Sequence, residues 1–220
     1  MNREQAISYI AQAYVKNLSQ SGMQKVFDKL TEEFCSYQQT GDTDTLRYLL
    51  ALSLRSRHGR RMPWANTKAA VDILIKKGIQ SYGFDHFSDL YLSLQEWFWD
   101  IPFARGSLML YDASLNIGHF LPIPTEPEET IYLNAGAWEG ALFLKDKGKV
   151  KHQMPVCEWQ SSDLFPGIES MYIEDILCIF KPIFKTLAEG VEVMHDEVDE
   201  RLKLRQYPFP KRNDVLRKLR

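Results

Sequence analysis

Apolar side chains recur at helical spacing along most of this chain. Residues 3–18 carry such a face, and residues 43–54 carry another that Asp42 or Thr43 can cap. A face of this kind is buried against a neighbouring element in a globular protein, so each segment predicts an amphipathic helix. The other segments with this spacing are 21–35, the stretch from Phe87 through Leu94, 66–77, 107–119, 135–145, 169–188 and 190–204.

Proline, glycine and β-branched residues mark where this helical pattern is interrupted. Pro182 lies inside 169–188 and must kink or divide that helix. Residues 131–133 are either a short strand or the entry to the next helix, and 146–168 form a loop or a small hairpin. The sequence therefore predicts an all-α fold, or nearly so, with about eight helices and at most two short strands. We expect a single globular domain over 1–168, with C-terminal helices and a basic tail over 169–220 packed on the same core.

Composition places the chain among ordinary globular proteins. It has 220 residues, 45% of them hydrophobic, and a formal net charge of −2. That charge excludes a strong overall field, so a role in nucleic-acid binding needs a local basic patch. We find no signal peptide and no run approaching the roughly 20 apolar residues of a membrane span. The three widely spaced cysteines fit reduced, buried thiols, so we expect a cytoplasmic protein without membrane contact.

A dense basic segment lies between two of the predicted helices. Its cationic residues are Arg55, Arg57, His58, Arg60 and Arg61. Arginine offers a planar fork of donors that suits phosphate oxygens, and a loop can direct several forks at one nucleic-acid backbone. The alternative is a solvated turn whose arginines pair with nearby acidic residues.

A second candidate is the segment 101–118, in which a tight turn separates two helices. Its turn residues Arg105, Gly106 and Ser107 could bring backbone N–H groups close to a phosphate at a helix N-terminus. Together with Tyr111-Asp112, Ile117-Gly118 and the block 131–136, this segment resembles a group of bacterial all-helical proteins that has no established activity. It is also distantly similar, over about 67–145, to the helix-hairpin-helix DNA glycosylase superfamily.

The glycosylase resemblance implies a DNA-binding hairpin and, for an enzyme, a catalytic aspartate. Asp112 is the one residue available for that role, although the family's aspartate lies further beyond the second hairpin helix. Ala104 stands where the family has the first hairpin glycine, and its Cβ impedes close phosphate approach. The alternative is an ordinary packing corner that needs Gly106 for its backbone shape.

The segment 134–141 is rich in small residues that let a helix approach its neighbour. Asn134 can cap this helix, and free N–H groups around Gly136 could bind an anion. The alternative is tight helix packing alone. The glycine spacing does not fit a dinucleotide loop, and a Glu192–His195 pair lacks the second unit of a di-metal site, so we expect no cofactor and no metal.

These features favour a non-enzymatic helical module that binds nucleic acid or protein, with the basic segment and the hairpin forming one anion-binding surface. A DNA- or nucleobase-processing enzyme of glycosylase type and a structural subunit of a larger assembly remain open. The binding hypothesis requires the arginines of 55–61 and the basic tail 211–220 to converge beside the 102–107 turn.

Overall fold

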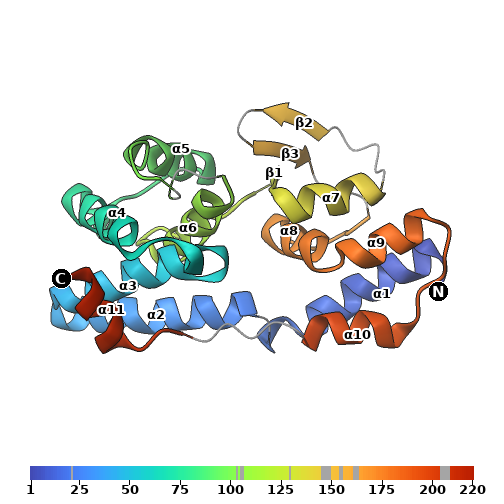
Figure 1. The fold of residues 1–220 in the computed structure, drawn as a ribbon, viewed down its shortest axis with the longest axis horizontal. Helices are drawn as coiled ribbons and strands as arrows, with labels where there is room; N and C mark the ends of the chain where they lie inside the picture. The colour runs from blue at the N-terminus through green and yellow to red at the C-terminus, as the bar shows by residue number, and fades with distance from the viewer. Residues whose placement is uncertain are drawn as a thin grey trace. The chain divides into compact units, whose positions relative to one another are not determined.

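The computed structural model describes residues 1–20, 22–102, 104, 107–128, 130–144, 150–153, 156–160, 164–203 and 209–220. Helices dominate this part of the chain, which confirms the expected nearly all-α class (Figure 1). The described residues form eleven α-helices rather than about eight. Two of the additional helices come from the division of 169–188 at Pro182 and from the basic tail, which forms a helix of its own.

The helices belong to two compact units, and the chain passes from one unit to the other more than once. Unit 1 comprises Met1–Ser21 and Pro127–Gln206, and unit 2 comprises Gly22–Glu126 and Tyr207–Arg220. These boundaries differ from the predicted boundary between residues 168 and 169. The reason is that the last helix packs with residues 22–126, whereas the helices before it pack with the first helix of the chain.

Unit 1 buries a continuous apolar core between its helices and a small sheet. Helices α1, α8 and α9 contribute Ile10, Ile176 and Phe184, all fully buried. The elements of unit 1 are α1 (Arg3–Lys16), η1 (Leu18–Gln20), β1 (Thr130–Leu133), α7 (Ala135–Leu144), β2 (Val150–Gln153), β3 (Val156–Gln160), α8 (Ser170–Ile179), α9 (Lys181–Ala188) and α10 (His195–Lys203).

The sheet of unit 1 is antiparallel, with the strand order β1-β3-β2. Ile131 of β1 and Val150 of β2 both pair with Trp159 of β3. Of the two alternatives for residues 131–133, the strand is therefore the one found, and the pairing of β2 with β3 matches the hairpin alternative for 146–168. The described backbone pairs three short segments, where the sequence predicted at most two strands.

Unit 2 is built around α6 (Ser107–Phe120), a helix enclosed by its neighbours. Every residue from Leu110 to Gly118 is buried, because α6 packs against α2, α3, α5 and η2. A helix that is covered on all sides is typically apolar all round, as most of this one is. The other elements of unit 2 are α2 (Gly22–Thr40), α3 (Thr43–Arg55), η2 (Arg57–Arg61), α4 (Trp64–Lys77), η3 (Ile79–Ser81), α5 (Phe87–Trp97) and α11 (Arg212–Leu219).

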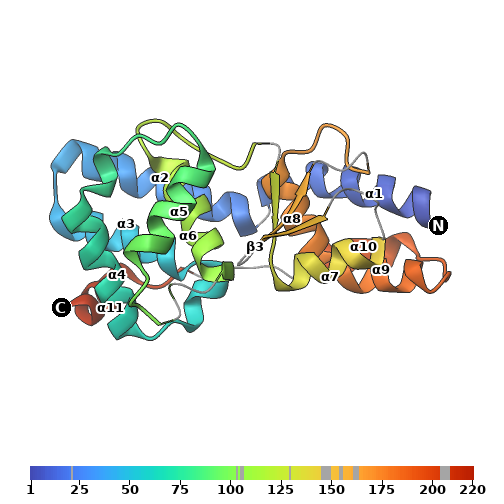
Figure 2. The same ribbon diagram turned by 90° about the horizontal axis from the view of Figure 1, so that it is seen from above.

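Helix α11 lies against α3 and α4 in unit 2, and Figure 2 shows it beside α4. Its apolar residues Val215, Leu216 and Leu219 are buried there. The basic end of the chain therefore docks as a short helix. In the described part of the chain, no helix is both long and apolar enough to span a membrane.

Candidate functional site

Arg55 closes the basic segment into a compact loop. Its guanidinium group donates hydrogen bonds to the carbonyl oxygens of Met62 and of Arg60 (2.7 Å), and to Thr67 Oγ1 (3.0 Å). Its Cζ atom also lies 3.9 Å from the centre of the Trp64 ring. Burial lowers the pKa of Arg55 from its usual range, and arginine side chains stay charged in proteins. Arg55 therefore organises the loop, and both of its terminal nitrogens donate to groups within the protein.

Two contacts attach this loop to the central helix α6. Asn116 Nδ2 donates to the Ser53 carbonyl (2.8 Å) and to Ser56 Oγ, at the junction between α3 and η2. Gly59 approaches the end of α3 so closely that an added Cβ would lie 1.8 Å from the Leu54 carbonyl oxygen. Only glycine fits at this position. The backbone of the loop is thus held against α3 and α6.

The loop packs against α6 of the hairpin segment through η2, and the helix that follows the loop lies beside the start of that segment. Asn66 Nδ2 in the first turn of α4 donates to the Pro102 carbonyl oxygen (2.7 Å). The hairpin residues Arg105 and Gly106 lie outside the described residues, as do the side chains of Ser107, Arg57 and His58. The backbone therefore brings the two predicted segments together, whereas the hairpin phosphate contact stays a prediction.

The C-terminal helix reaches the same place through Lys218. Its Nζ atom lies 5.1 Å from the centre of the half-buried Trp64 ring. Arg60 and Arg61 are exposed and precede Trp64 by only a few residues. We call the group Arg60, Arg61, Trp64 and Lys218 the basic corner.

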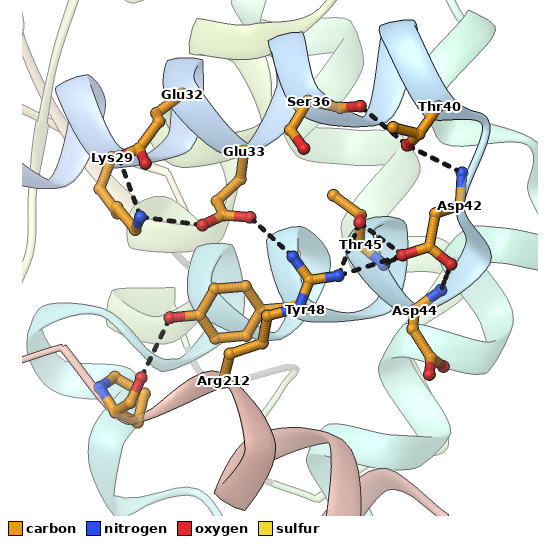
Figure 3. A network of polar contacts seen from close by, with 11 residues as sticks. Lys29, Glu32, Glu33, Ser36, Thr40, Asp42, Asp44, Thr45, Tyr48 and Arg212 are labelled. Carbon is orange, nitrogen blue, oxygen red and sulfur yellow. Dashed lines mark hydrogen bonds and ion pairs between the residues drawn. The ribbon is translucent and has the colours of Figure 1, made fainter.

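Other cations of the tail are held by acidic residues of unit 2. Figure 3 shows the Arg212 guanidinium between Glu33 (3.5 Å) and Asp42 (3.0 Å), with Thr45 Oγ1 at 2.7 Å. Asp42 is the N-cap of α3, as the sequence predicted. Hydrogen bonds from the Thr45 hydroxyl and N–H lower the pKa of Asp42, and the charge of Arg212 acts in the same direction. Arg212 thus fastens α11 to α2 and α3.

Asp112, the candidate catalytic residue, lies inside unit 2 and is 2% exposed. It occupies the second turn of α6, between the fully buried Tyr111 and the buried Ala113. The carboxyl group of Asp112 is therefore almost completely shielded from solvent within unit 2.

Asn134 and Gly136 belong to unit 1, whereas the basic corner belongs to unit 2. Asn134 precedes α7, and its backbone carbonyl accepts from Ala137 (2.8 Å). An added Cβ at Gly136 would lie 3.0 Å from Cys178 Sγ, and one at Gly140 would lie 2.3 Å from the Leu177 carbonyl oxygen. These contacts support the packing alternative for 134–141, with α7 pressed against α8.

Sequence reasoning did not identify Trp64 as part of the basic corner, nor Asn116 as the residue that holds the neighbouring loop. The predicted basic tail included Lys218, but its contact with Trp64 was not foreseen because the two residues are far apart in the chain. The only local signal was the position of Trp64 directly after the basic segment, since large rings flanked by cations often stack with them.

The cysteines test the prediction that the thiols are buried. Cys35 is exposed and Cys178 is half-buried, and both are free cysteines. The expectation of buried thiols is therefore wrong for Cys35, which lies on the solvent side of α2.

Within the described ranges, no group of three or more His, Cys, Asp or Glu residues could hold a metal ion.

Comparison with known protein families, curated proteins and solved structures finds no match to this chain.

Proposed function

We propose that this protein is a non-enzymatic module that binds the phosphate backbone of nucleic acids at the basic corner. The observation that carries the proposal is the meeting of α3, α4 and α11 at Trp64. There the Cζ atom of Arg55 lies 3.9 Å from the centre of the ring, and Lys218 Nζ lies 5.1 Å from it. Arg60 and Arg61, which precede Trp64 by a few residues, are exposed.

The chemistry of these groups suits a phosphate backbone. Arginine binds phosphate oxygens through paired N–H donors, and lysine adds a point charge. The resemblance to helix-hairpin-helix proteins supports the same proposal, because Asn66, two residues after Trp64 in α4, donates to the Pro102 carbonyl oxygen of the segment that carries the resemblance.

Rigidity of the loop is a further support. The hydrogen bonds of Arg55 and Asn116 hold the backbone of η2 in place, so Arg60 and Arg61 start from a fixed backbone. A site that is organised before binding loses less conformational entropy when the ligand arrives.

The test is a binding titration with the double variant Arg60→Ala/Arg61→Ala. Fluorescence anisotropy would follow a labelled single-stranded oligonucleotide and the matching duplex at several salt concentrations. If both arginines contact phosphates, affinity should fall for every sequence. The slope of log K against log salt, which is negative, should become less steep by about 1.8 for duplex DNA.

A matched control removes the same charge elsewhere in unit 2. Lys25 on α2 and Lys76 in the last turn of α4 are both exposed. Lys25→Ala/Lys76→Ala should leave affinity and salt slope close to those of the wild type. Equal behaviour of the two double variants would show that the basic corner has no special role.

A further inference from the structure

A pocket of about 280 Å³ lies between α3, α4 and α11 in unit 2. Its lining residues are Asp44, Arg47, Lys68, Leu216, Leu219 and Arg220. We call it the α11 pocket. Three separate elements each supply one cation to it, and the apolar residues come from α11.

Two aspartates hold these three cations in place. Asp72 accepts from Arg47 Nη1 (2.9 Å) and from Lys68 Nζ (2.8 Å), so one carboxylate serves two cations. Arg220 Nη2 lies 3.3 Å from Asp44 Oδ2. Three cationic side chains therefore share two side-chain carboxylates around the pocket.

The α11 pocket and the basic corner are built on the same two helices, α4 and α11. Lys68 follows Trp64 by one helical turn and lies on the same side of α4. Lys218, which approaches the Trp64 ring, directly precedes Leu219 and Arg220 of the pocket. A ligand held at Trp64 can therefore extend into the pocket along the line where α4 meets α11.

We propose that the α11 pocket binds a phosphate monoester group. A monoester carries a charge of about −1.5 to −2 near neutral pH, whereas a phosphodiester within a strand carries one negative charge. Cations on three elements suit the more highly charged group, and the small volume suits a single phosphate with its sugar.

Two sources could supply this group: the phosphorylated end of a nucleic-acid strand, or a free nucleotide. The first source rests on the proposed function, because the strand must also lie on the basic corner. The pocket itself stands on its own lining residues.

The experiment compares one labelled oligonucleotide in three forms, with a phosphate at its 5′ end, at its 3′ end, or at neither end. We expect the wild type to bind one phosphorylated form about ten-fold more tightly than the unphosphorylated form, the effect of one charge-assisted hydrogen bond. Arg220→Ala should abolish this difference.

Arg217→Ala is the matched control for Arg220→Ala. Both arginines lie at the end of α11, their side chains are 75% and 76% exposed, and each pairs with one aspartate. Only Arg220 lines the pocket. A second pair, Lys68→Gln against the exposed Lys76→Gln, makes the same comparison on α4, and circular dichroism would verify that each variant is folded.

A calorimetric titration with inorganic phosphate and with adenosine monophosphate distinguishes the two sources. Binding of either probe that Arg220→Ala removes and Arg217→Ala keeps would support the pocket even if no strand binds and the proposed function fails. If strands bind equally with and without a terminal phosphate, and neither small probe binds, the pocket proposal is overturned while the proposed function stands.

Discussion

His119 shows at the scale of one residue how packing alters protonation. Its ring stacks on Phe27 with the centroids 4.3 Å apart, and its Nε2 lies 3.1 Å from Thr31 Oγ1. Burial lowers the pKa of His119 below its usual 6.5, while the nearby Asp28 acts weakly in the opposite direction. The folded protein therefore favours the neutral ring.

This shift makes the free energy of unfolding depend on pH. Because the unfolded state binds the proton more readily, the stabilisation is complete above pH 6.5 and is lost as the pH falls through 6.5 to the lower pKa of the folded state. We expect urea denaturation to give a lower unfolding free energy at pH 5.5 than at pH 7.5. His119→Phe, which keeps the stacked ring, should show a smaller decrease, and an equal decrease in both proteins would contradict this role of His119.

At the scale of the element, α7 depends on glycine for its approach to α8. A Cβ at Gly140 would meet a backbone carbonyl at 2.3 Å, whereas one at Gly136 would meet the Cys178 side chain at 3.0 Å. A side chain can move away from an added methyl group more easily than a backbone carbonyl can. We therefore expect the position of Gly136 to accept a larger residue more readily than that of Gly140.

Alanine at each position would separate these two cases. Alanine favours a helix over glycine by about 1 kcal/mol, and this gain offsets part of any steric cost. We expect Gly140→Ala to destabilise the protein by about 1–3 kcal/mol, as overpacked cores do, and Gly136→Ala to change stability much less. Thermal unfolding measures both, and a Gly140→Ala protein as stable as Gly136→Ala would exclude the close contact.

At the scale of the whole molecule, each unit is built from two separate stretches of the chain. Helix α10 belongs to unit 1 and the next helix, α11, belongs to unit 2. Arg212, Arg220 and the Tyr48 hydroxyl, which donates to the Pro210 carbonyl (3.0 Å), fasten the end of the chain to α2 and α3.

Arg212→Ala should therefore loosen α11 and leave unit 1 unchanged. We expect faster amide hydrogen exchange in α11 and at the start of α3, where Arg212 contacts Asp42, and unaltered exchange in α8 and α9. The loss in global stability should be about 1 kcal/mol or less, because partly exposed ion pairs contribute little. Arg217→Ala, whose partner Asp214 lies within α11, serves as the control.

Local signals located most elements of this fold. Asp42 caps α3, Gly78 ends α4 in the left-handed conformation, and Pro182 separates α8 from α9. Each signal depends on the geometry of one residue and its immediate neighbours. The division into units could not be predicted in this way, because it depends on which apolar faces meet.

By itself, the sequence determined the helical class of this protein and the positions of its turns, since spacing, capping and backbone geometry act over a few residues. It also identified a dense basic segment. Tertiary structure alone decided that Arg55 turns inward onto Trp64, that Arg212 pairs with Glu33 and Asp42, and that Lys218 joins the basic corner. These outcomes depend on contacts between residues far apart in the chain, and such contacts leave no periodic signal in the order of residues.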